Sequence, residues 1–493
     1  MIYILCFIIG GLYTLSFSPY SINIASIISI IILLLLLDLD SMKDAIMKSF
    51  LFSLGYFSFG TYWLENVINH YTNISFFITF FIIFSFIIYL SAFIVIPVAV
   101  TSYLKQNLKL DKNYALIILS VLVTFFEILR SFLFTGFSWF NFGQAALDTP
   151  LSHFFPIFGV HGLTLIIFLI SLIIINIIRG NNLKFYIPLS VIILSIYVNI
   201  YSKEWTSVND EKINISILQP NITNKLSYSK KDILMNMETL NDLTLKSLIN
   251  NPDIIVWPEA PLPLPYNDIK NTYYEKILEN IPASTVLISG SFYKKNNAIF
   301  NSLINITDSK NIYHKQHLVP FGEYLPFRNY LTFFYNALGM DILDISKGVG
   351  LKSIGIKDYI AHSLICYESI FSIDSLIKNP NADFIINVTN DGWFGDSLAP
   401  VQHLDALRMR SLENQRYSVR AASSGISAII SPYGEIIEYV PYGKRGSLNY
   451  NISPINGLTP LSQYGYNILY ILMFFIFLYS TIYYNFNVFR RKN

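Results

Sequence analysis

Long apolar runs fill the first two hundred or so residues of the chain, and only short polar loops interrupt them. A run of about 17–25 apolar residues is long enough to cross the hydrocarbon core of a membrane as a helix. The pattern predicts seven membrane helices there and an eighth near the C-terminal end. They are expected near residues 2–18, 22–37, 46–64, 74–103, 114–134, 154–178, 184–202 and 464–489. The first run lacks a basic n-region and a small-residue cleavage site, so it predicts a retained helix and not a signal peptide.

Basic residues occur in alternate loops of this predicted bundle. The loops after the second, fourth and sixth helices carry lysine or arginine, and those after the first, third and fifth carry neither. The basic residues are Lys43, Lys48, Lys105, Lys109, Lys112, Arg179 and Lys184. The positive-inside rule therefore places both termini in the cytoplasm and the segment after the seventh helix outside. In a bacterium this predicts a multi-pass protein of the inner membrane, with that segment on the periplasmic face.

The polar pattern changes between the seventh and eighth helices, where short apolar runs alternate with amphipathic ones. Strands are expected at 213–219, 253–257, 285–290, 302–306, 311–314, 359–365, 382–388 and 426–431. Helices are expected at 230–249, 267–280, 370–378 and 401–422. About 250 residues suffice for one well-packed domain. We therefore expect a membrane region at 1–204, an α/β domain at 205–460, and a last membrane helix with a basic cytoplasmic tail at 461–493.

The composition agrees with a membrane protein and narrows the possible partners. Hydrophobic residues make up 53% of the chain, charged residues 13%, and the mean hydropathy is +0.46. The net charge of +2 does not suggest nucleic acid as a partner. The two cysteines, Cys6 and Cys366, lie far apart in the sequence and one is in an apolar run, so we expect no disulfide framework. Cys366 can therefore persist as a free thiol.

Three residues that suit one type of chemistry each follow a predicted strand. Cys366 comes directly after one buried strand, Glu259 follows a second in Trp-Pro-Glu-Ala, and Lys315 follows a third. Each has an ordinary alternative when taken alone: a packed thiol, an acidic turn residue and a solvated lysine. Together they describe acyl transfer through a thioester. A thiolate attacks, a carboxylate transfers protons, and an ammonium group stabilises the oxyanion.

A metal site is a weaker interpretation of the same region. His314 and His317 are three residues apart, but the sequence offers no third ligand nearby, so we expect no metal. The acyl-transfer chemistry needs no cofactor, and we expect none.

The order Glu-Lys-Cys resembles the nitrilase superfamily, whose domain is an αββα sandwich. Longer segments resemble the apolipoprotein N-acyltransferase family, and they run from about residue 10 to the last helix. These are WPEAPLPLP, YHKQHLVPFGEYLPF, ICYES and NVTNDGWFGDSLAPVQHLDALRMRSLENQR, together with GYFSFGTYWLENVI and EILRSFLFTGFSWFNFGQ in the membrane region. The resemblance implies an eight-helix membrane bundle joined to a nitrilase-like αββα domain.

The resemblance also implies roles for single residues. Glu259 is the expected general base, Lys315 the oxyanion-stabilising residue and Cys366 the nucleophile. The residues expected to support them or to contact the lipid substrate are Glu323, Tyr367, Glu368, Asn301 and Trp393, of which Trp393 is the expected substrate-binding aromatic. The implied acyl donor is a membrane phospholipid, and the implied acceptor is the α-amino group of the diacylglyceryl-cysteine of an apolipoprotein. We expect a monomer.

Two other function classes stay open at this point. A membrane-tethered amidase or nitrilase would use the same triad with water as second nucleophile. The other is a non-enzymatic membrane protein, a transporter or a scaffold with a degenerate outer domain. Its helices should carry a polar pathway, but Glu127 and Arg130 are the only charges well inside a predicted membrane helix. They are three apart and can form a pair, with either a structural or a functional role. Four arginines are expected to be mostly solvated or ion-paired on the helix 401–422, one of them near a lipid phosphate: Arg408, Arg410, Arg416 and Arg420.

Overall fold

The computed structural model describes residues 1–493 apart from 72–73, 180–185, 202, 223, 226, 338–343 and 493. The chain forms two compact units. We call the first the helical unit; it contains Met1–Glu65, Phe76–Glu204 and Tyr464–Asn493. The second, the sheet unit, contains Asn66–Ser75 and Trp205–Gln463.

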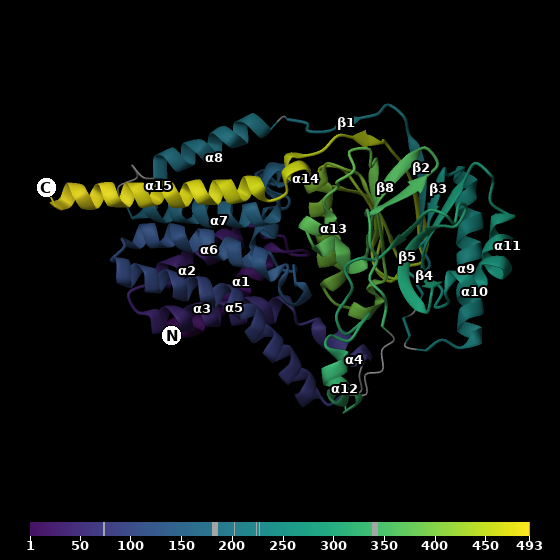
Figure 1. Ribbon diagram of the computed structural model, residues 1–493, viewed down its shortest axis with the longest axis horizontal. Helices are drawn as coiled ribbons and strands as arrows, with labels where there is room; N and C mark the ends of the chain where they lie inside the picture. The colour runs from purple at the N-terminus through teal and green to yellow at the C-terminus, as the bar shows by residue number, and fades with distance from the viewer. Residues whose placement is uncertain are drawn as a thin grey trace. The chain divides into compact units, whose positions relative to one another are not determined.

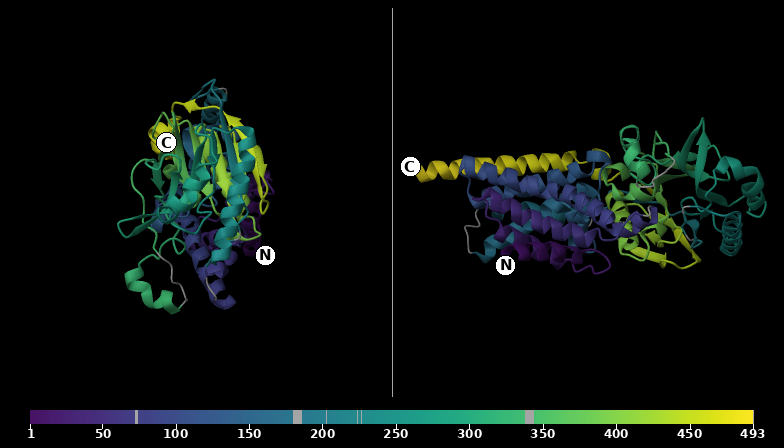
Figure 2. Two further views of the ribbon diagram at one scale, coloured as in Figure 1. Left: turned by 90° about the vertical axis from the view of Figure 1, so that its right-hand side faces the viewer. Right: turned by 90° about the horizontal axis from the view of Figure 1, so that it is seen from below.

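Long helices run side by side through the helical unit (Figures 1 and 2). They are α1 (Ile2–Tyr13), α2 (Ile24–Leu36), α3 (Met42–Gly60), α5 (Phe76–Leu108), α6 (Lys112–Arg130), α7 (Phe155–Ile178), α8 (Tyr186–Ile200) and α15 (Asn467–Lys492). The short helices α4 (Leu64–Tyr71) and α14 (Pro460–Tyr464) lie where the chain passes between the units. Short 3₁₀ turns occur at Thr14–Ser16, Leu133–Thr135, Phe142–Ala146 and Pro150–Phe154.

Three helical segments in the described part of the chain are long and apolar enough to cross a membrane: Phe76–Leu108, Lys112–Arg130 and Pro150–Ile178. Three more are apolar but shorter, namely Ile2–Ser16, Ile24–Leu36 and Asn467–Ile482. At 1.5 Å per residue, the 13 residues of α2 extend only about 20 Å, against a hydrocarbon core of about 30 Å. The expected total of eight spans therefore stays a prediction.

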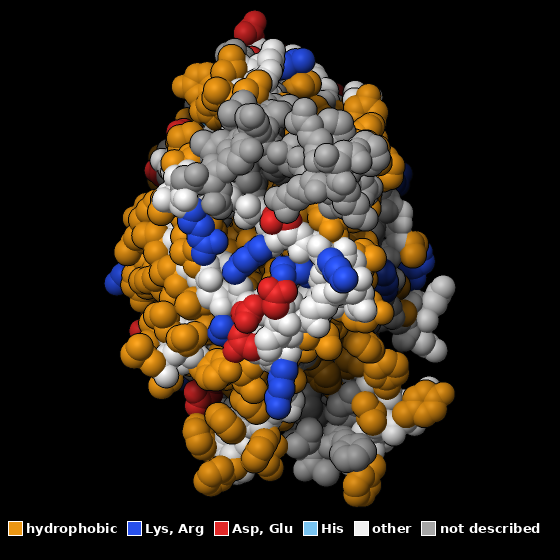
Figure 3. Space-filling model, turned by 90° about the vertical axis from the view of Figure 1, so that its left-hand side faces the viewer, with side chains coloured by type: hydrophobic (Ala, Val, Ile, Leu, Met, Phe, Trp, Pro, Cys, Tyr) orange, Lys and Arg blue, Asp and Glu red, His pale blue; other side chains and the backbone are white. Residues whose placement is uncertain are grey.

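Charged side chains gather at one end of the helical unit, between flanks of hydrophobic side chains (Figure 3). Three of the basic residues predicted for the loops lie within helices α3, α5 and α6 and make local contacts. Lys48 pairs with Asp44 at 2.6 Å, Lys105 pairs with Asp40, and Lys112 donates to the carbonyl oxygen of Leu37 at 2.8 Å.

The paired charges Glu127 and Arg130 are buried inside the helical unit, 3.8 Å apart. Glu127 accepts a hydrogen bond from the backbone N–H of Phe142 at 2.7 Å. Arg130 donates to the carbonyl oxygens of Trp139 and Phe140, both at 2.8 Å. Both side chains thus satisfy the backbone of the loop after α6, which is a structural role.

Two six-stranded sheets form the centre of the sheet unit. Their strand orders are β13-β2-β3-β4-β5-β6 and β12-β11-β10-β9-β8-β7. The first contains β2 (Ile213–Gln219), β3 (Ile254–Val256), β4 (Val286–Lys295), β5 (Ala298–Asn305), β6 (Ile312–His314) and β13 (Gly446–Ile452). The second contains β7 (Ser353–Ile356), β8 (Tyr359–Ile365), β9 (Phe384–Thr389), β10 (Ser418–Ala422), β11 (Ser427–Ile430) and β12 (Ile436–Val440). A separate antiparallel pair joins β1 (Ser207–Val208) to β14 (Ile455–Asn456).

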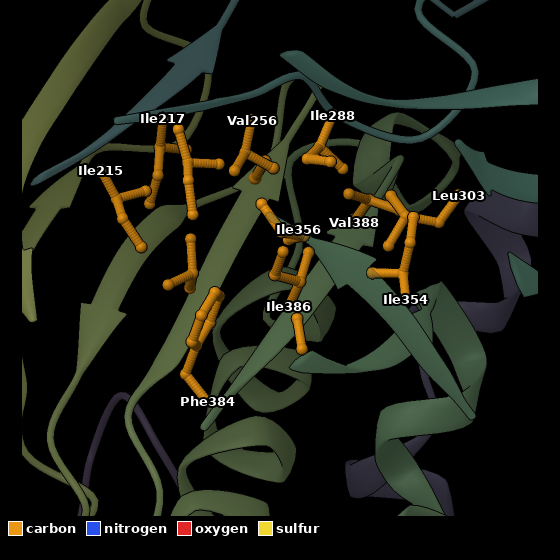
Figure 4. Packing of buried hydrophobic residues seen from close by; sticks show 14 of the residues in the cluster. Ile215, Ile217, Val256, Ile288, Leu303, Ile354, Ile356, Phe384, Ile386 and Val388 are labelled. Atoms are coloured by element: carbon orange, nitrogen blue, oxygen red, sulfur yellow. The ribbon is translucent and has the colours of Figure 1, made fainter. Parts of the chain in front are cut away.

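The two sheets pack face to face through a buried aliphatic core (Figure 4). Ile217, Val256 and Ile288 from one sheet meet Ile356, Ile386 and Val388 from the other within that core. α9 (Lys230–Ser247), α10 (Tyr266–Ile269) and α11 (Glu275–Leu278) cover one side, and α13 (Ala399–Asn414) covers the other (Figure 1). The sheet unit therefore has four layers in the order helix, sheet, sheet and helix.

One predicted helix of this region is too long, and another is wrong. The helix expected at 401–422 ends at Asn414, because Gln415 adopts a left-handed conformation with φ of 47° and the chain then enters β10. The helix expected at 370–378 is replaced by 3₁₀ turns at Cys366–Ile370 and Ile373–Ser375. The sequence also did not predict β7, β12, β13 or α12 (Arg328–Ala337).

The four arginines are consequently not on one helix, and of the two expected alternatives, solvated or ion-paired, the ion-paired one holds for three of them. Arg408 and Arg410 lie on α13, Arg416 lies in the connection, and Arg420 lies on β10. All four are buried. Arg408, Arg410 and Arg420 pair with Asp405, Glu413 and Asp391 respectively, whereas Arg416 donates to backbone carbonyl oxygens. In the sequence, arginines of a buried polar network resemble the solvated face of a helix. This explains why the helix was predicted to continue to residue 422.

Candidate active site

The three residues expected to form the triad all follow strands of the sheet unit. Glu259 comes three residues after β3, Lys315 directly after β6, and Cys366 directly after β8. β3 and β6 belong to one sheet and β8 to the other. Strand ends are rigid mounts for side chains, so the face-to-face sheets bring residues from both of them to one place.

The backbone beside Glu259 approaches β4 so closely that only glycine fits there. A Cβ on Gly290 would lie 2.6 Å from Cα of Glu259 and 2.7 Å from the carbonyl oxygen of Pro258. The N–H of Gly290 donates to that carbonyl oxygen at 3.2 Å. The carboxylate itself is buried and accepts hydrogen bonds from Asn301 Nδ2 at 2.7 Å and from the backbone N–H of Asn390 at 2.8 Å. Glu259 is therefore held both at its backbone, by the close approach of Gly290, and at its carboxylate, by these two hydrogen bonds.

Lys315 lies between two carboxylates. Its Nζ is 3.0 Å from Oε1 of Glu323 and 3.6 Å from Oε1 of Glu259, and only 1% of its side chain is exposed. Burial alone would lower the pKa of Lys315, but the charges of Glu323 and Glu259 outweigh it and raise that pKa above its ordinary value. The ammonium group thus stays charged at neutral pH.

Asn301 connects the same two carboxylates. Its Nδ2 donates to Glu259 at 2.7 Å and to Oε1 of Glu323 at 2.8 Å, and its backbone carbonyl oxygen accepts the backbone N–H of Lys315 at 2.8 Å. The other oxygen of Glu323 accepts the N–H of Val319 at 2.8 Å. The structure therefore brings Asn301 and Glu323 together with Glu259 and Lys315.

Cys366 is half-buried and holds an unusual backbone conformation, with φ of 49°. This left-handed region costs an L-residue other than glycine roughly 1–2 kcal/mol. Burial and the charge of Glu259 raise the pKa of the Cys366 thiol, while Lys315 and a hydrogen bond with Thr389 lower it by less. The raised pKa favours the neutral thiol form of Cys366. Burial likewise raises the pKa of Glu259, against the opposing charge of Lys315, which suits a proton acceptor.

Glu368 is fully buried and joins the residue before Cys366 to the segment after Lys315. Its carboxylate accepts the backbone N–H of Ile365 at 2.8 Å and that of Gln316 at 2.9 Å. It also accepts the hydroxyl of Tyr313 at 2.7 Å and pairs with Lys352 at 3.1 Å. Burial alone would raise the pKa of Glu368, but Lys352 and these hydrogen bonds lower it. Glu368 thus ties the ends of β8 and β6 together.

Tyr367 and Trp393 lie beside this centre on short turns. The ring of Tyr367 is half-buried and contacts those of His317 and Phe371, with centroids 5.7 and 5.0 Å away. Trp393 lies in the 3₁₀ turn Asp391–Phe394, and its ring meets that of His70 edge-on at 4.7 Å. His70 belongs to the part of α4 that groups with the sheet unit. The sequence analysis did not assign this segment, Asn66–Ser75, to the catalytic domain.

His314 and His317 have separate partners. His314 Nδ1 lies 2.7 Å from the hydroxyl of Ser302, and His317 Nδ1 lies 2.7 Å from the carboxylate of Asp374.

The sequence analysis gave no role to Asn390, whose backbone N–H donates to Glu259, or to Gly290. Asn390 opens the NDGWFG segment that contains Trp393, which is the one signal that could have drawn attention to it.

Comparison with known proteins agrees with this arrangement in both parts of the chain. The family model "Apolipoprotein N-acyltransferase N-terminal domain" matches residues 9–173, and the model "Carbon-nitrogen hydrolase" matches residues 214–454. The apolipoprotein N-acyltransferase of Wigglesworthia glossinidia brevipalpis is 32% identical over 470 residues, which cover 92% of this chain and 93% of that protein. The chain belongs to the apolipoprotein N-acyltransferase family.

Other members of the family match over similar lengths. The protein from Haemophilus ducreyi is 30% identical and the match covers 96% of this chain and 94% of that one. The protein from Coxiella burnetii is also 30% identical, with 94% and 96% covered. The sheet unit thus contains the carbon-nitrogen hydrolase domain of a membrane-associated acyltransferase, and the helical unit contains the family's N-terminal domain apart from Asn66–Ser75.

Proposed function

We propose that this enzyme acylates apolipoproteins in two half-reactions at Cys366. In the first, Glu259 takes the thiol proton and Sγ attacks the ester carbonyl carbon of a membrane phospholipid. The C–S bond forms, the ester C–O bond breaks, and Glu259 returns the proton to the leaving lysophospholipid. The product of this step is an acyl thioester on Cys366.

In the second half-reaction, the α-amino group of an N-terminal diacylglyceryl-cysteine attacks the thioester carbon. The C–N bond forms, the C–S bond breaks, and the proton released by the amine passes through Glu259 to the departing Sγ. The products are an N-acylated lipoprotein and the free thiol. Since each substrate reacts with a different form of the enzyme, we expect ping-pong kinetics.

The observation that carries this proposal is the convergence of a buried carboxylate and a buried ammonium group beside Cys366. Glu259 and Lys315 lie 3.6 Å apart, and the charges of both act on the pKa of the thiol. Lys315 keeps its positive charge and so supports an oxyanion in both tetrahedral intermediates. Glu323 and Asn301 position Lys315 and Glu259, Tyr367 and Glu368 support the nucleophile, and Trp393 contacts the lipid substrate.

The membrane arrangement is part of the proposal. We assign eight spans, both termini in the cytoplasm, and the catalytic domain on the periplasmic face of the bacterial inner membrane. The gathering of charged side chains at one end of the helical unit supports a cytoplasmic end there (Figure 3). The proposed division is 1–204, 205–460 and 461–493. The enzyme acts as a monomer without a nucleic-acid partner, cofactor or metal.

A membrane-tethered amidase is less well supported than the acyltransferase. It would account for the carbon-nitrogen hydrolase match, but not for the match of residues 9–173 to the acyltransferase N-terminal domain.

The test is acyl transfer by the purified full-length protein in detergent. The donor is a phospholipid with a labelled acyl chain, and the acceptor is a synthetic diacylglyceryl-cysteinyl peptide. We expect the label on the peptide amine, and no transfer to a matched peptide whose amine is acetylated. Release of the label as free fatty acid, with none on the peptide, would contradict the proposal and favour a hydrolase.

A further inference from the structure

A buried chain of polar groups runs from β10 to the backbone of the nucleophile. Arg420 Nη2 donates to Oδ2 of Asp391 at 2.7 Å, and Oδ1 of Asp391 lies 2.8 Å from Nδ1 of His403. On the far side of the imidazole ring, Nε2 lies 3.1 Å from the carbonyl oxygen of Cys366. Arg420 and Asp391 are 0% exposed and His403 is 1% exposed. None of these three residues was a candidate for the site in the sequence.

The direction of the last hydrogen bond follows from its partners. A backbone carbonyl oxygen only accepts, so Nε2 of His403 donates to Cys366. The hydroxyl of Ser369 donates to the same carbonyl oxygen at 3.0 Å, and its oxygen also lies 3.0 Å from Nε2 of His403. Two donors therefore converge on the carbonyl oxygen of one residue.

That carbonyl belongs to the residue with the strained backbone. Cys366 has φ of 49°, which an L-residue rarely adopts unless its surroundings impose it. The orientation of this backbone sets the direction in which Cβ and Sγ point. Hydrogen bonds that fix the carbonyl oxygen of Cys366 therefore also fix the direction in which its Sγ points.

The same arginine also reaches the strand that carries the nucleophile. Arg420 donates to Oδ1 of Asn387, whose Nδ2 donates to the carbonyl oxygen of Leu364 on β8 at 3.2 Å. Asp391 has a lowered pKa because Arg420 and His403 outweigh the opposing effect of burial. It is thus a permanent carboxylate that orients both side chains.

We propose that His403, oriented by Asp391 and Arg420, is a positioning residue that holds Cys366 in its reactive backbone conformation. It does not touch the substrate, and its role is to keep Sγ directed at the acyl carbon. The inference rests on the proposed function, because it concerns the same nucleophile. It predicts slower chemistry with little change in lipid binding, whereas a role in folding alone predicts lower stability and normal chemistry in the folded fraction.

Two substitutions separate the two contacts of the imidazole. The amide nitrogen of His403→Gln falls near Nε2 and keeps the donor to Cys366, while that of His403→Asn falls near Nδ1 and keeps only the contact with Asp391. We expect kcat for acylation of Cys366 by a diacyl phospholipid to stay within about tenfold of wild type in His403→Gln. In His403→Asn we expect a loss of about a hundredfold with KM little changed. His362→Gln, a buried histidine four residues before Cys366 on β8, is the matched control.

A second measurement does not depend on the lipid substrate. The rate at which iodoacetamide alkylates Cys366 in the folded, detergent-solubilised protein should change in His403→Asn and not in His362→Gln. Normal acylation and alkylation in folded His403→Asn, or equal losses in the Asn and Gln variants, would overturn the proposal. If His403→Asn does not fold, Ser369→Ala removes the other donor to the same carbonyl oxygen, and unchanged kcat in that variant would overturn it. Absence of acylation in the wild type would instead count against the proposed function.

Discussion

Lys315 donates to Glu323 at 3.0 Å, a shorter distance than the 3.6 Å that separates its Nζ from Glu259. The ammonium group is therefore held mainly by a carboxylate other than the expected base. Because Asn301 and the N–H of Asn390 also hold Glu259, the expected base and the expected oxyanion-stabilising residue are neighbours without being each other's only partner. This division leaves Glu259 free to accept and return a proton.

The first prediction concerns the hydrogen bond between Lys315 and Glu323. Glu323→Gln keeps the size of the side chain but removes its charge, so Lys315 should move toward Glu259 and neutralise the base. We expect kcat to fall about a hundredfold, as for the loss of one oxyanion-stabilising group. Steady-state kinetics of lipopeptide acylation measure this change. A variant with wild-type kcat would show that Glu323 does not position Lys315.

The second prediction is the pH dependence of thioester formation. Because the pKa values of Glu259 and of the Cys366 thiol are both raised, Glu259 must be ionised to take the proton of a neutral thiol. The acylation rate should therefore rise with pH through a Glu259 pKa above its ordinary 4.5, and reach a plateau before the ordinary thiol value of 9.0.

Acylation of Cys366, followed by mass spectrometry between about pH 4 and about pH 10, provides the profile. Lys315, whose pKa is raised, should produce no decline below its ordinary value of 10.5. A single rise centred near 9.0 would mean that the thiolate forms without Glu259 and would contradict the assignment of the base.

The third prediction concerns Glu368 and stability. A carboxylate with a lowered pKa stabilises the folded state at neutral pH, and this contribution is lost as the pH falls through its folded-state value. Glu368→Gln should therefore cost about 3 kcal/mol of unfolding free energy at pH 7. The difference from wild type should shrink as the pH falls below the ordinary value of 4.5.

Denaturant unfolding at several pH values measures both effects. Glu238→Gln on the exposed face of α9 is the matched control and should show neither. A stability difference between wild type and Glu368→Gln that does not depend on pH would show that Glu368 is not a buried carboxylate with a lowered pKa.

The fourth prediction concerns the close approach of β4 to the base. In Gly290→Ala, the new methyl group must displace the backbone of Glu259, from whose Cα it would lie 2.6 Å away. We expect a loss of about 1–3 kcal/mol in stability and a lower kcat. In Gly446→Ala on β13, the new Cβ has its nearest neighbour at 3.5 Å, so stability and kcat should change little. Equal changes in stability and kcat in the two variants would contradict the prediction that Gly290 is needed for the close approach of β4 to Glu259.

The sequence predicted the elements that carry the triad because apolar strands followed by one polar residue form a clear pattern. Cys366 after β8 and Lys315 after β6 lie where that pattern put them. It did not predict β10, because Arg416 and Arg420 look like the polar face of a helix until their buried partners are known. Hydrogen bonds such as those of Asn390 and His403 join residues far apart in the chain, and no local pattern contains them. The left-handed conformation of Cys366 is likewise set by tertiary contacts.

The central claim is that Cys366 carries the acyl group between the two lipids, and intact-protein mass spectrometry tests it most directly. Purified enzyme incubated with a phospholipid of defined chain composition, without an acceptor, should gain the mass of one acyl chain. Peptide mapping should place that mass on Cys366, and hydroxylamine should remove it as expected for a thioester. Cys366→Ala should gain none. An acyl adduct that persists in Cys366→Ala, or that maps to another residue, would contradict the account.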